Sequence, residues 1–205
     1  MSQRIRSLPI RPILATALLL GACQTPPPIV VTAQFAPSAA LATRTIENVA
    51  VLPVEDGTSN GGAAKVLTLM RQEVERRLVD RLYSPLATRE VDNGLRAAPA
   101  TASGDSIMVP ATLQKLAGHA HEDAVFAMRV DKWDEGVLQV QNKVWFQFQA
   151  VMVGSDGVQL WSGTIQGEVK AGGTNPAPFD RDGKARSCAE LAVREMMLQL
   201  PRRGA

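Results

Sequence analysis

Two histidines and two acidic residues lie close together in the middle of the chain. His119, His121, Glu122 and Asp123 place metal-ligating side chains within five residues. A His-x-His pair on an extended segment points both imidazole rings to the same side. A zinc site would still need ligands from elsewhere, and the chain has no other histidine. We therefore predict two exposed loop histidines and no bound metal, with weak Zn or Ni binding at His119 and His121 as the alternative.

A glycine-rich segment, Gly57 to Gly62, follows a predicted strand and precedes a predicted helix. The start of a helix after such a loop can cradle a phosphate. A Walker motif, however, needs Lys and Ser/Thr directly after its last glycine, and here Ala63 and Ala64 come before Lys65. We predict a flexible connection, with phosphate binding as the alternative.

The sequence shows little sign of a hydrolase active site. The Gly-x-Ser-x-Gly elbow of a serine hydrolase does not occur. Asp131, Asp134 and Glu135 could act as paired carboxylates, but they flank Trp133 at a predicted strand end and are more simply solvated turn residues. We predict no enzymatic activity and no cofactor.

Three tryptophans mark the packing of the predicted sheet. Trp133 and Trp161 are expected to pack the sheet against helices, whereas Trp145 lies opposite the face that carries Val144 and Phe146. Because tryptophan is enriched at interface hot spots, an exposed Trp145 is the best candidate for a partner contact.

The amino-terminal segment has the order of a bacterial secretory signal. Arg4, Arg6 and Arg11 form a cationic region, and an uncharged run of Leu and Ala follows over residues 13–22. This run is about half as long as the roughly 20 apolar residues that span a bilayer as a helix. We predict a removable signal over residues 1–22 rather than a transmembrane helix.

The end of this signal, Leu20-Gly21-Ala22-Cys23, resembles the lipobox of bacterial lipoproteins. The resemblance implies cleavage between Ala22 and Cys23, a diacylglycerol on the Cys23 sulfur, and a fatty acid such as palmitate on the new amine. Several acyl chains anchor a protein stably, whereas one binds only marginally. The alternative is an ordinary signal peptide with a chance cysteine. Gln24, rather than the Asp of inner-membrane retention, favours the outer membrane with the domain facing the periplasm.

The charge and the cysteine content limit which kinds of partner the chain can have. The chain has 22 Lys and Arg against 20 Asp and Glu, a net charge of +2. Removing the three arginines of the signal leaves a net charge of −1, so we expect no nucleic-acid partner. If Cys23 is acylated, Cys188 has no intrachain partner. It lies in an amphipathic helical pattern, and burial is predicted over a disulfide between chains.

The mature chain divides into a tether and one domain. Residues 23–44 are uncharged up to Thr43 and rich in proline, which predicts a lipid-anchored tether, although Ile29 to Val31 could instead pair onto a sheet edge. Residues 45–205 form a single domain. Apolar runs and alternation predict five strands at 48–54, 83–87, 124–133, 143–153 and 158–170. Four-residue spacing, caps and prolines predict helices at 63–82, 88–95, 110–117 and 184–200.

The order β-α-β-α-α-β-β-β-α predicts an α/β fold of mixed type. The early βαβ unit implies parallel pairing, and the late hairpin across Gly154 to Gly157 implies antiparallel pairing. A mixed sheet of about five strands with helices packed on its faces, in three layers, buries all of these elements.

These residues resemble a family of outer-membrane lipoproteins of Gram-negative bacteria. That family is related in fold to the curli secretion-channel lipoprotein, to lipoprotein activators of penicillin-binding proteins, and to the amino-terminal domain of the Tol propeller protein. The resemblance spans about residues 45–170 and departs from the family at His119 to Glu122. Residues 49–53, the glycine-rich loop and the helix after it match the wider group, and the likeness to the family itself rests on five segments: 93–95, 113–116, 123–125, 131–133 and 160–163. It implies a three-layer α/β domain, no enzymatic activity, and a role in envelope secretion or assembly.

Taken together, the pattern favours a non-enzymatic, membrane-anchored interaction module at the outer membrane. We expect it to assemble with itself or with an envelope protein, as an accessory of a secretion or transport system. The alternatives are a regulator of peptidoglycan synthases, which rests on fold-level analogy alone, and a periplasmic domain that binds a small ligand or metal.

Overall fold

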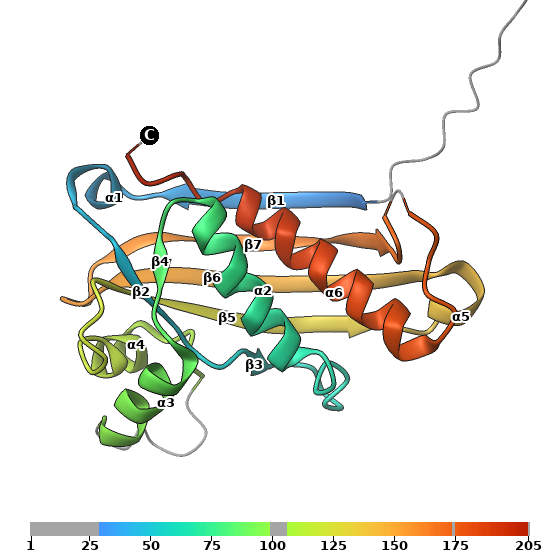
Figure 1. Ribbon diagram of the computed structural model, residues 1–205, viewed down its shortest axis with the longest axis horizontal. Coiled ribbons are helices and arrows are strands. Elements are labelled where there is room, and N and C mark those ends of the chain that lie inside the picture. The colour runs from blue at the N-terminus through green and yellow to red at the C-terminus, as the bar shows by residue number, and fades with distance from the viewer. Residues whose placement is uncertain (1–28, 99–105, 174, 205) are drawn as a thin grey trace, which may run out of the picture.

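One mixed β-sheet organises the molecule. The computed structural model describes residues 29–98, 106–173 and 175–204. The seven strands are joined in the order β1-β7-β6-β5-β2-β4, with β3 paired to β5 beside this path (Figure 1). They span β1 (Ile29–Pro37), β2 (Asn48–Val51), β3 (Glu55–Asp56), β4 (Ser84–Pro85), β5 (Ala124–Asp134), β6 (Lys143–Gly154) and β7 (Gln159–Lys170). The pairings of β2 with β4 and β5 are parallel, and those among β5, β6, β7 and β1 are antiparallel, which confirms the predicted mixed sheet.

Six helices accompany the sheet in the described residues. They are α1 (Ala39–Thr43), α2 (Leu67–Asp80), α3 (Thr88–Ala97), α4 (Pro110–Leu116), α5 (Leu138–Gln141) and α6 (Arg181–Leu198). The order predicted from residue 45 onwards is confirmed, with β3 and α5 as short additions. No helix among these combines the length and apolarity needed to cross a bilayer.

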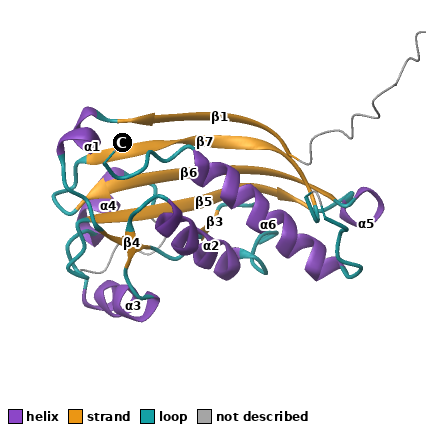
Figure 2. Ribbon diagram, turned by 45° about the horizontal axis from the view of Figure 1, so that its top comes forward, coloured by secondary structure: helices purple, strands orange, loops and turns teal. Residues whose placement is uncertain are grey.

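The larger core lies between the sheet and the helices α2 and α6, which run side by side across one face (Figures 1 and 2). Four-residue spacing places Met70, Val74 and Leu78 on the buried side of α2. The same spacing buries Cys188, Ala192 and Met196 on α6. These side chains meet the inward side chains of the strands, which include Phe126, Phe146, Phe148, Trp161 and Ile165.

A smaller core lies on the opposite face of the sheet. Val91 of α3 and Leu113 of α4 pack there against a patch of strand residues formed by Ala50, Leu52, Val125, Ala127, Val151 and Val153. The predicted third layer therefore covers the part of the sheet around β2, β5 and the end of β6. The outer faces of β7 and β1 carry no helix from this cluster.

The predicted tether over residues 23–44 is wrong from Ile29 onwards. Ile29–Pro37 forms β1 and pairs along its whole length with β7, so the alternative of sheet-edge pairing is confirmed. The reason is period-two alternation: Ile29, Val31, Ala33 and Phe35 are packed against the main core, and polar or small residues alternate with them. With β3, this strand raises the sheet from the predicted five strands to seven.

Two glycines on β7 allow β1 to approach closely. A Cβ atom at Gly163 would lie 2.1 Å from the Gln34 carbonyl oxygen, and one at Gly167 would lie 2.1 Å from that of Val30. The gap at Gly163 is taken by Phe35, whose ring stacks on Trp161 at 4.4 Å between centroids. Thus β1 is an integral strand, docked by aromatic stacking as well as by its ladder.

Candidate binding surfaces

The outer face of β1, β7 and β6 is lined by polar side chains. The strand registers align its side chains in cross-strand rows, such as Thr32, Gln166 and Gln147, and Gln34, Thr164 and Gln149. All six side chains are exposed or half-buried. Because amides and hydroxyls both donate and accept hydrogen bonds, this face can bind a polar protein surface without a large desolvation cost. We call these six residues and Trp145 the open face.

Trp145 lies at one end of the open face, in a cross-strand row with Glu168 and Val30. It is 42% exposed, and the Lys132 ammonium lies 4.8 Å from its ring centroid. The prediction that Trp145 lies opposite the buried Val144 and Phe146 is confirmed, as is the burial of Trp133 and Trp161. A contact between Trp145 and a partner remains a prediction.

The outer edge of β1, which pairs with no further strand among the described residues, is the second unusual surface. β1 is the terminal strand of the sheet and runs for nine residues. None of these residues is charged. Proteins usually protect long sheet edges with charged side chains, bulges or very short strands, because an open edge pairs with other chains. An unprotected edge of this length is suited to pairing with another strand.

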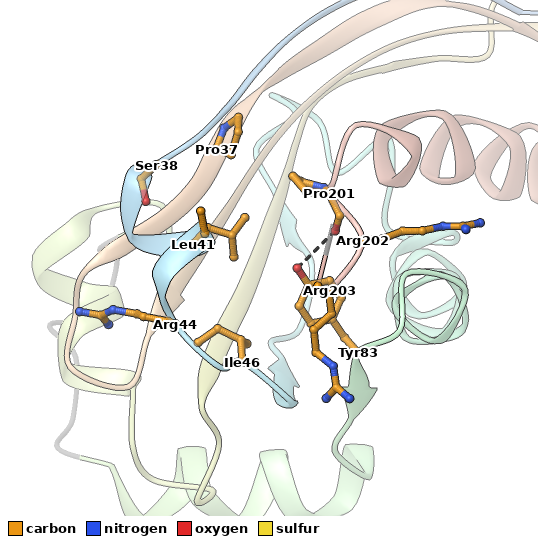
Figure 3. Close-up of a pocket in the computed structure, with 11 residues that line it drawn as sticks. Pro37, Ser38, Leu41, Arg44, Ile46, Tyr83, Pro201, Arg202 and Arg203 are labelled. Carbon is orange, nitrogen blue, oxygen red and sulfur yellow. Dashed lines mark hydrogen bonds between the residues drawn. The ribbon is translucent and has the colours of Figure 1, made fainter.

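A cavity of about 270 Å³ lies where the end of β1, α1 and the carboxyl-terminal segment meet. Leu41, Ile46 and Pro201 surround it, and the Tyr83 hydroxyl closes one side by donating to the Pro201 carbonyl oxygen at 3.2 Å (Figure 3). Burial raises the pKa of Tyr83, so its phenol stays neutral and can donate. The lining has the chemistry to hold a small apolar group.

Arg44, at the rim of this cavity, is directed away from it (Figure 3). Its guanidinium makes two 2.7 Å hydrogen bonds to the Asp156 carboxylate, and this pairing lowers the pKa of Asp156 to about 2. The arginine therefore joins the start of the domain to the β6–β7 turn. The lining comes from three separate stretches of chain, so no local motif in the sequence could have revealed the cavity.

The histidines occupy an exposed turn, as predicted. The His119 imidazole donates from Nε2 to the Lys115 carbonyl oxygen at 2.9 Å, and His121 has left-handed backbone geometry with a φ of 58°. The buried Glu122 carboxylate accepts hydrogen bonds from the backbone amides of Gly118 and Ala120. Glu122 thus stabilises the turn, and within the described residues no three His, Cys, Asp or Glu side chains come together as metal ligands would.

The glycine-rich loop directs its hydrogen bonds inward. The Asp56 carboxylate accepts from the backbone amide and hydroxyl of Thr58, and the Thr58 hydroxyl oxygen accepts from the Gly62 amide at 2.8 Å. The regular helix α2 begins only at Leu67. Two of the loop amides are therefore already used, and the loop does not lead directly into a helix start as a phosphate cradle does.

The acidic residues around Trp133 hold a turn. Glu135 accepts a 2.9 Å hydrogen bond from the Trp133 indole and pairs with Arg181 at 2.9 Å. Asp134 accepts from the Gly136 amide at 2.9 Å. Asp131 lies 3.0 Å from the Arg129 guanidinium. The prediction of solvated turn residues is therefore confirmed for Asp134 alone. It is wrong for the other two, because Asp131 lies within β5 and the side chains of Asp131 and Glu135 are each only 17% exposed.

Cys188 is fully buried and free, which confirms the predicted burial. Burial raises the pKa of its thiol to about 12. The thiolate, which is the reactive form, is therefore a negligible fraction at pH 8.

We expect Cys188 in folded residues 23–205 carrying Cys23→Ser to resist iodoacetamide at pH 8. In urea, the thiol returns to its ordinary pKa of roughly 8.5 and should react within minutes to hours. Mass spectrometry after timed quenching measures both rates. Equal rates with and without urea would show that the α6–sheet interface does not enclose this thiol.

The residues of the predicted lipid-attachment site, Ala22 and Cys23, lie outside the described residues. The domain that follows them begins close by, since five residues separate Cys23 from the first residue of β1.

Comparisons with known proteins reach only distant likenesses. No family model matches the chain, and no curated protein matches it. Among solved structures, the chain is similar to lipoprotein GNA1162 from Neisseria meningitidis, with 21% identity, 63% of this chain and 84% of that one covered, and a TM-score of 0.43. It is also similar to the PelC dodecamer from Paraburkholderia phytofirmans (11% identity, 82% and 98% covered, TM-score 0.44). A third is the LpoB carboxyl-terminal domain from Salmonella enterica (14%, 62% and 85%, TM-score 0.40).

Solved structures similar to the chain thus include a bacterial lipoprotein. All three TM-scores lie below 0.5, and the likeness assigns no function.

Proposed function

We propose that the chain is a non-enzymatic, lipid-anchored protein of the bacterial envelope. It is held at the outer membrane through acylated Cys23, faces the periplasm, and serves as an accessory or assembly component of a secretion or transport system. The observation that carries this proposal is the signal ending in Leu20-Gly21-Ala22-Cys23, directly ahead of a single α/β domain.

Assembly is supported by two adjoining surfaces on β1. The first is its uncharged nine-residue edge, and the second is the open face, which begins on the same strand. A strand added to this edge would extend the open face by one more row of side chains. We propose that a second copy of the chain, or an envelope partner, pairs with the edge and contacts the open face around Trp145.

Blocking the edge tests the assembly. Thr32 and Gln34 are exposed on β1, so Thr32→Lys with Gln34→Lys adds charge without entering the core. Sedimentation velocity and envelope cross-linking of acylated chain should show a complex that the double variant loses. Thr68→Lys with Gln72→Lys makes the same two substitutions at exposed residues of α2, on the opposite face of the sheet from the open face. This double variant is the matched control and should retain the complex. A chain that stays monomeric and cross-links to no envelope protein would refute the proposal.

Trp145 is expected to contribute a large share of partner affinity. Trp145→Ala should weaken the complex by about 30-fold or more, the effect of losing a hot spot of roughly 2 kcal/mol. Titration of the cross-linked or sedimenting complex measures the change. An affinity equal to that of the unmodified chain would remove Trp145 from the interface.

A further inference from the structure

One end of the sheet is held near the predicted lipid anchor. Ile29, the first residue of β1, pairs with Val169 near the end of β7. The six Cα–Cα steps from Cys23 to Ile29 span at most about 20 Å when fully extended. If Cys23 is acylated, as the proposed function holds, this end cannot move further than that from the acylated residue.

The same end gathers two loops. The first joins β5 to β6 and contains α5, and the second, residues 171–180, joins β7 to α6. The two loops contact each other, since the Ala171 amide donates to the Asn142 carbonyl oxygen at 2.7 Å. Figure 1 shows α5, the end of β7, the start of α6 and the start of β1 together at one end of the molecule. We call the described residues of these loops, 135–142, 171–173 and 175–180, the anchor end.

Apolar side chains stand fully in solvent at the anchor end. Phe179 is 102% exposed and Val140 is 87% exposed. Val30, next to Ile29, is 59% exposed. These are the three most exposed large apolar side chains of the described residues, and all three lie at the end nearest Cys23. Leaving a phenylalanine in water is unfavourable, because burying its side chain gains about 1.5–3 kcal/mol.

Charge at this end is balanced rather than basic. Lys143 pairs with Glu168 at 2.5 Å, and Arg181 pairs with Glu135 at 2.9 Å. Exposed Lys170 is offset by exposed Asp180. An acidic protein surface or a nucleic acid would find no net attraction here, whereas an apolar medium within reach of the tether would accept Phe179 and Val140.

We propose that the anchor end rests on the lipid surface, with Phe179 and Val140 inserted among the headgroups and the first acyl carbons. The strands then lead away from the membrane. Since β7 has 12 residues, the cavity at its far end would lie about 40 Å from the anchor end. In this orientation the lipid fixes one end of the domain, and the open face stays accessible to partners from the side.

An environment-sensitive probe tests this orientation. Phe179→Cys in acylated chain, labelled with the fluorophore NBD and reconstituted in vesicles of phosphatidylcholine and phosphatidylglycerol, should show a blue-shifted emission that lipid-attached nitroxide quenches. The matched control is Val158→Cys, an exposed valine just before β7 at the opposite end. The probe at position 158 should show neither the shift nor the quenching.

The apolar contact itself is tested by Phe179→Ser with Val140→Ser in the acylated chain. The double variant and the unmodified chain both remain anchored through Cys23. On vesicles, hydrogen exchange of the backbone amides in 171–180 should be slow in the unmodified chain, and the double variant should lose that protection. Equal quenching at positions 179 and 158, or unchanged exchange, would overturn the proposal. If the chain does not sediment with vesicles at all, the lipid anchor has failed instead, so the two failures are distinguishable.

Discussion

Replacing Trp161 by alanine is expected to lower the free energy of unfolding by about 3–5 kcal/mol, the range for a truncated buried aromatic side chain. Trp161 is 0% exposed. Its ring lies between Phe35 of β1 and Phe126 of β5, with centroids at 4.4 and 5.9 Å. Its indole donates to the Gln199 carbonyl oxygen at 3.2 Å, after the end of α6. Truncating this one side chain therefore removes its contacts with β1, with β5 and with the residue that follows α6.

Trp145→Ala is the matched control for this truncation. It makes the same chemical change at a side chain that is 42% exposed, with one cation–π contact to Lys132. Its cost should stay below about 1 kcal/mol. Urea unfolding followed by far-ultraviolet circular dichroism measures both variants in residues 23–205 carrying Cys23→Ser. Similar costs for the two variants would contradict the position of Trp161 at the centre of the core.

The longest helices and strands were predictable from sequence because the apolar residues of each recur at a single regular spacing. The four-residue spacing of Met70, Val74 and Leu78 identified α2, and the alternation of Val144, Phe146 and Phe148 identified β6. The ends were less predictable. The predicted helix at 63–82 begins as a regular helix only at Leu67, because residues 62–66 form turns after the glycine-rich loop.

β1 shows why composition can mislead. Prolines and the absence of charge favoured a tether, yet its inward residues alternate as in a strand and Phe35 stacks on Trp161. The decisive partner lies on β7, more than a hundred residues away, where Gly163 makes room for β1. A contact between such distant residues leaves no local pattern to read.

The candidate surfaces were predictable only in part. Strand parity correctly placed Trp145 outside the core, because successive side chains point to opposite faces. The exposure of Phe179 and Val140 was not foreseen, since single apolar residues in a loop look the same in sequence whether they are buried or exposed. The cavity beside Tyr83 could be recognised only in the folded structure, because its lining comes from three stretches of chain.

Cys23→Ser is expected to abolish lipid attachment altogether. The sulfur of Cys23 is the predicted acceptor of diacylglycerol, and a serine hydroxyl is a far weaker nucleophile than a thiolate. Without its acyl chains, the domain loses roughly 0.8 kcal/mol of membrane affinity for every buried methylene group. The variant should take up no labelled palmitate and should leave the outer-membrane fraction.

Cys188→Ala is the matched control, because it removes the other cysteine of the chain. That residue lies on the buried side of α6 and should have no part in acylation. Labelling and outer-membrane sedimentation should both survive Cys188→Ala. Labelling that persists in Cys23→Ser would move the attachment site elsewhere.

The mass of the amino-terminal peptide from membrane-purified chain tests the lipid anchor most directly. The expected peptide starts at Cys23 and carries a diacylglyceryl group on sulfur and a fatty acyl group on the amine. A peptide that begins at Cys23 without lipid, or one that still contains Ala22 and the residues before it, would contradict the anchor and the membrane orientation that depends on it.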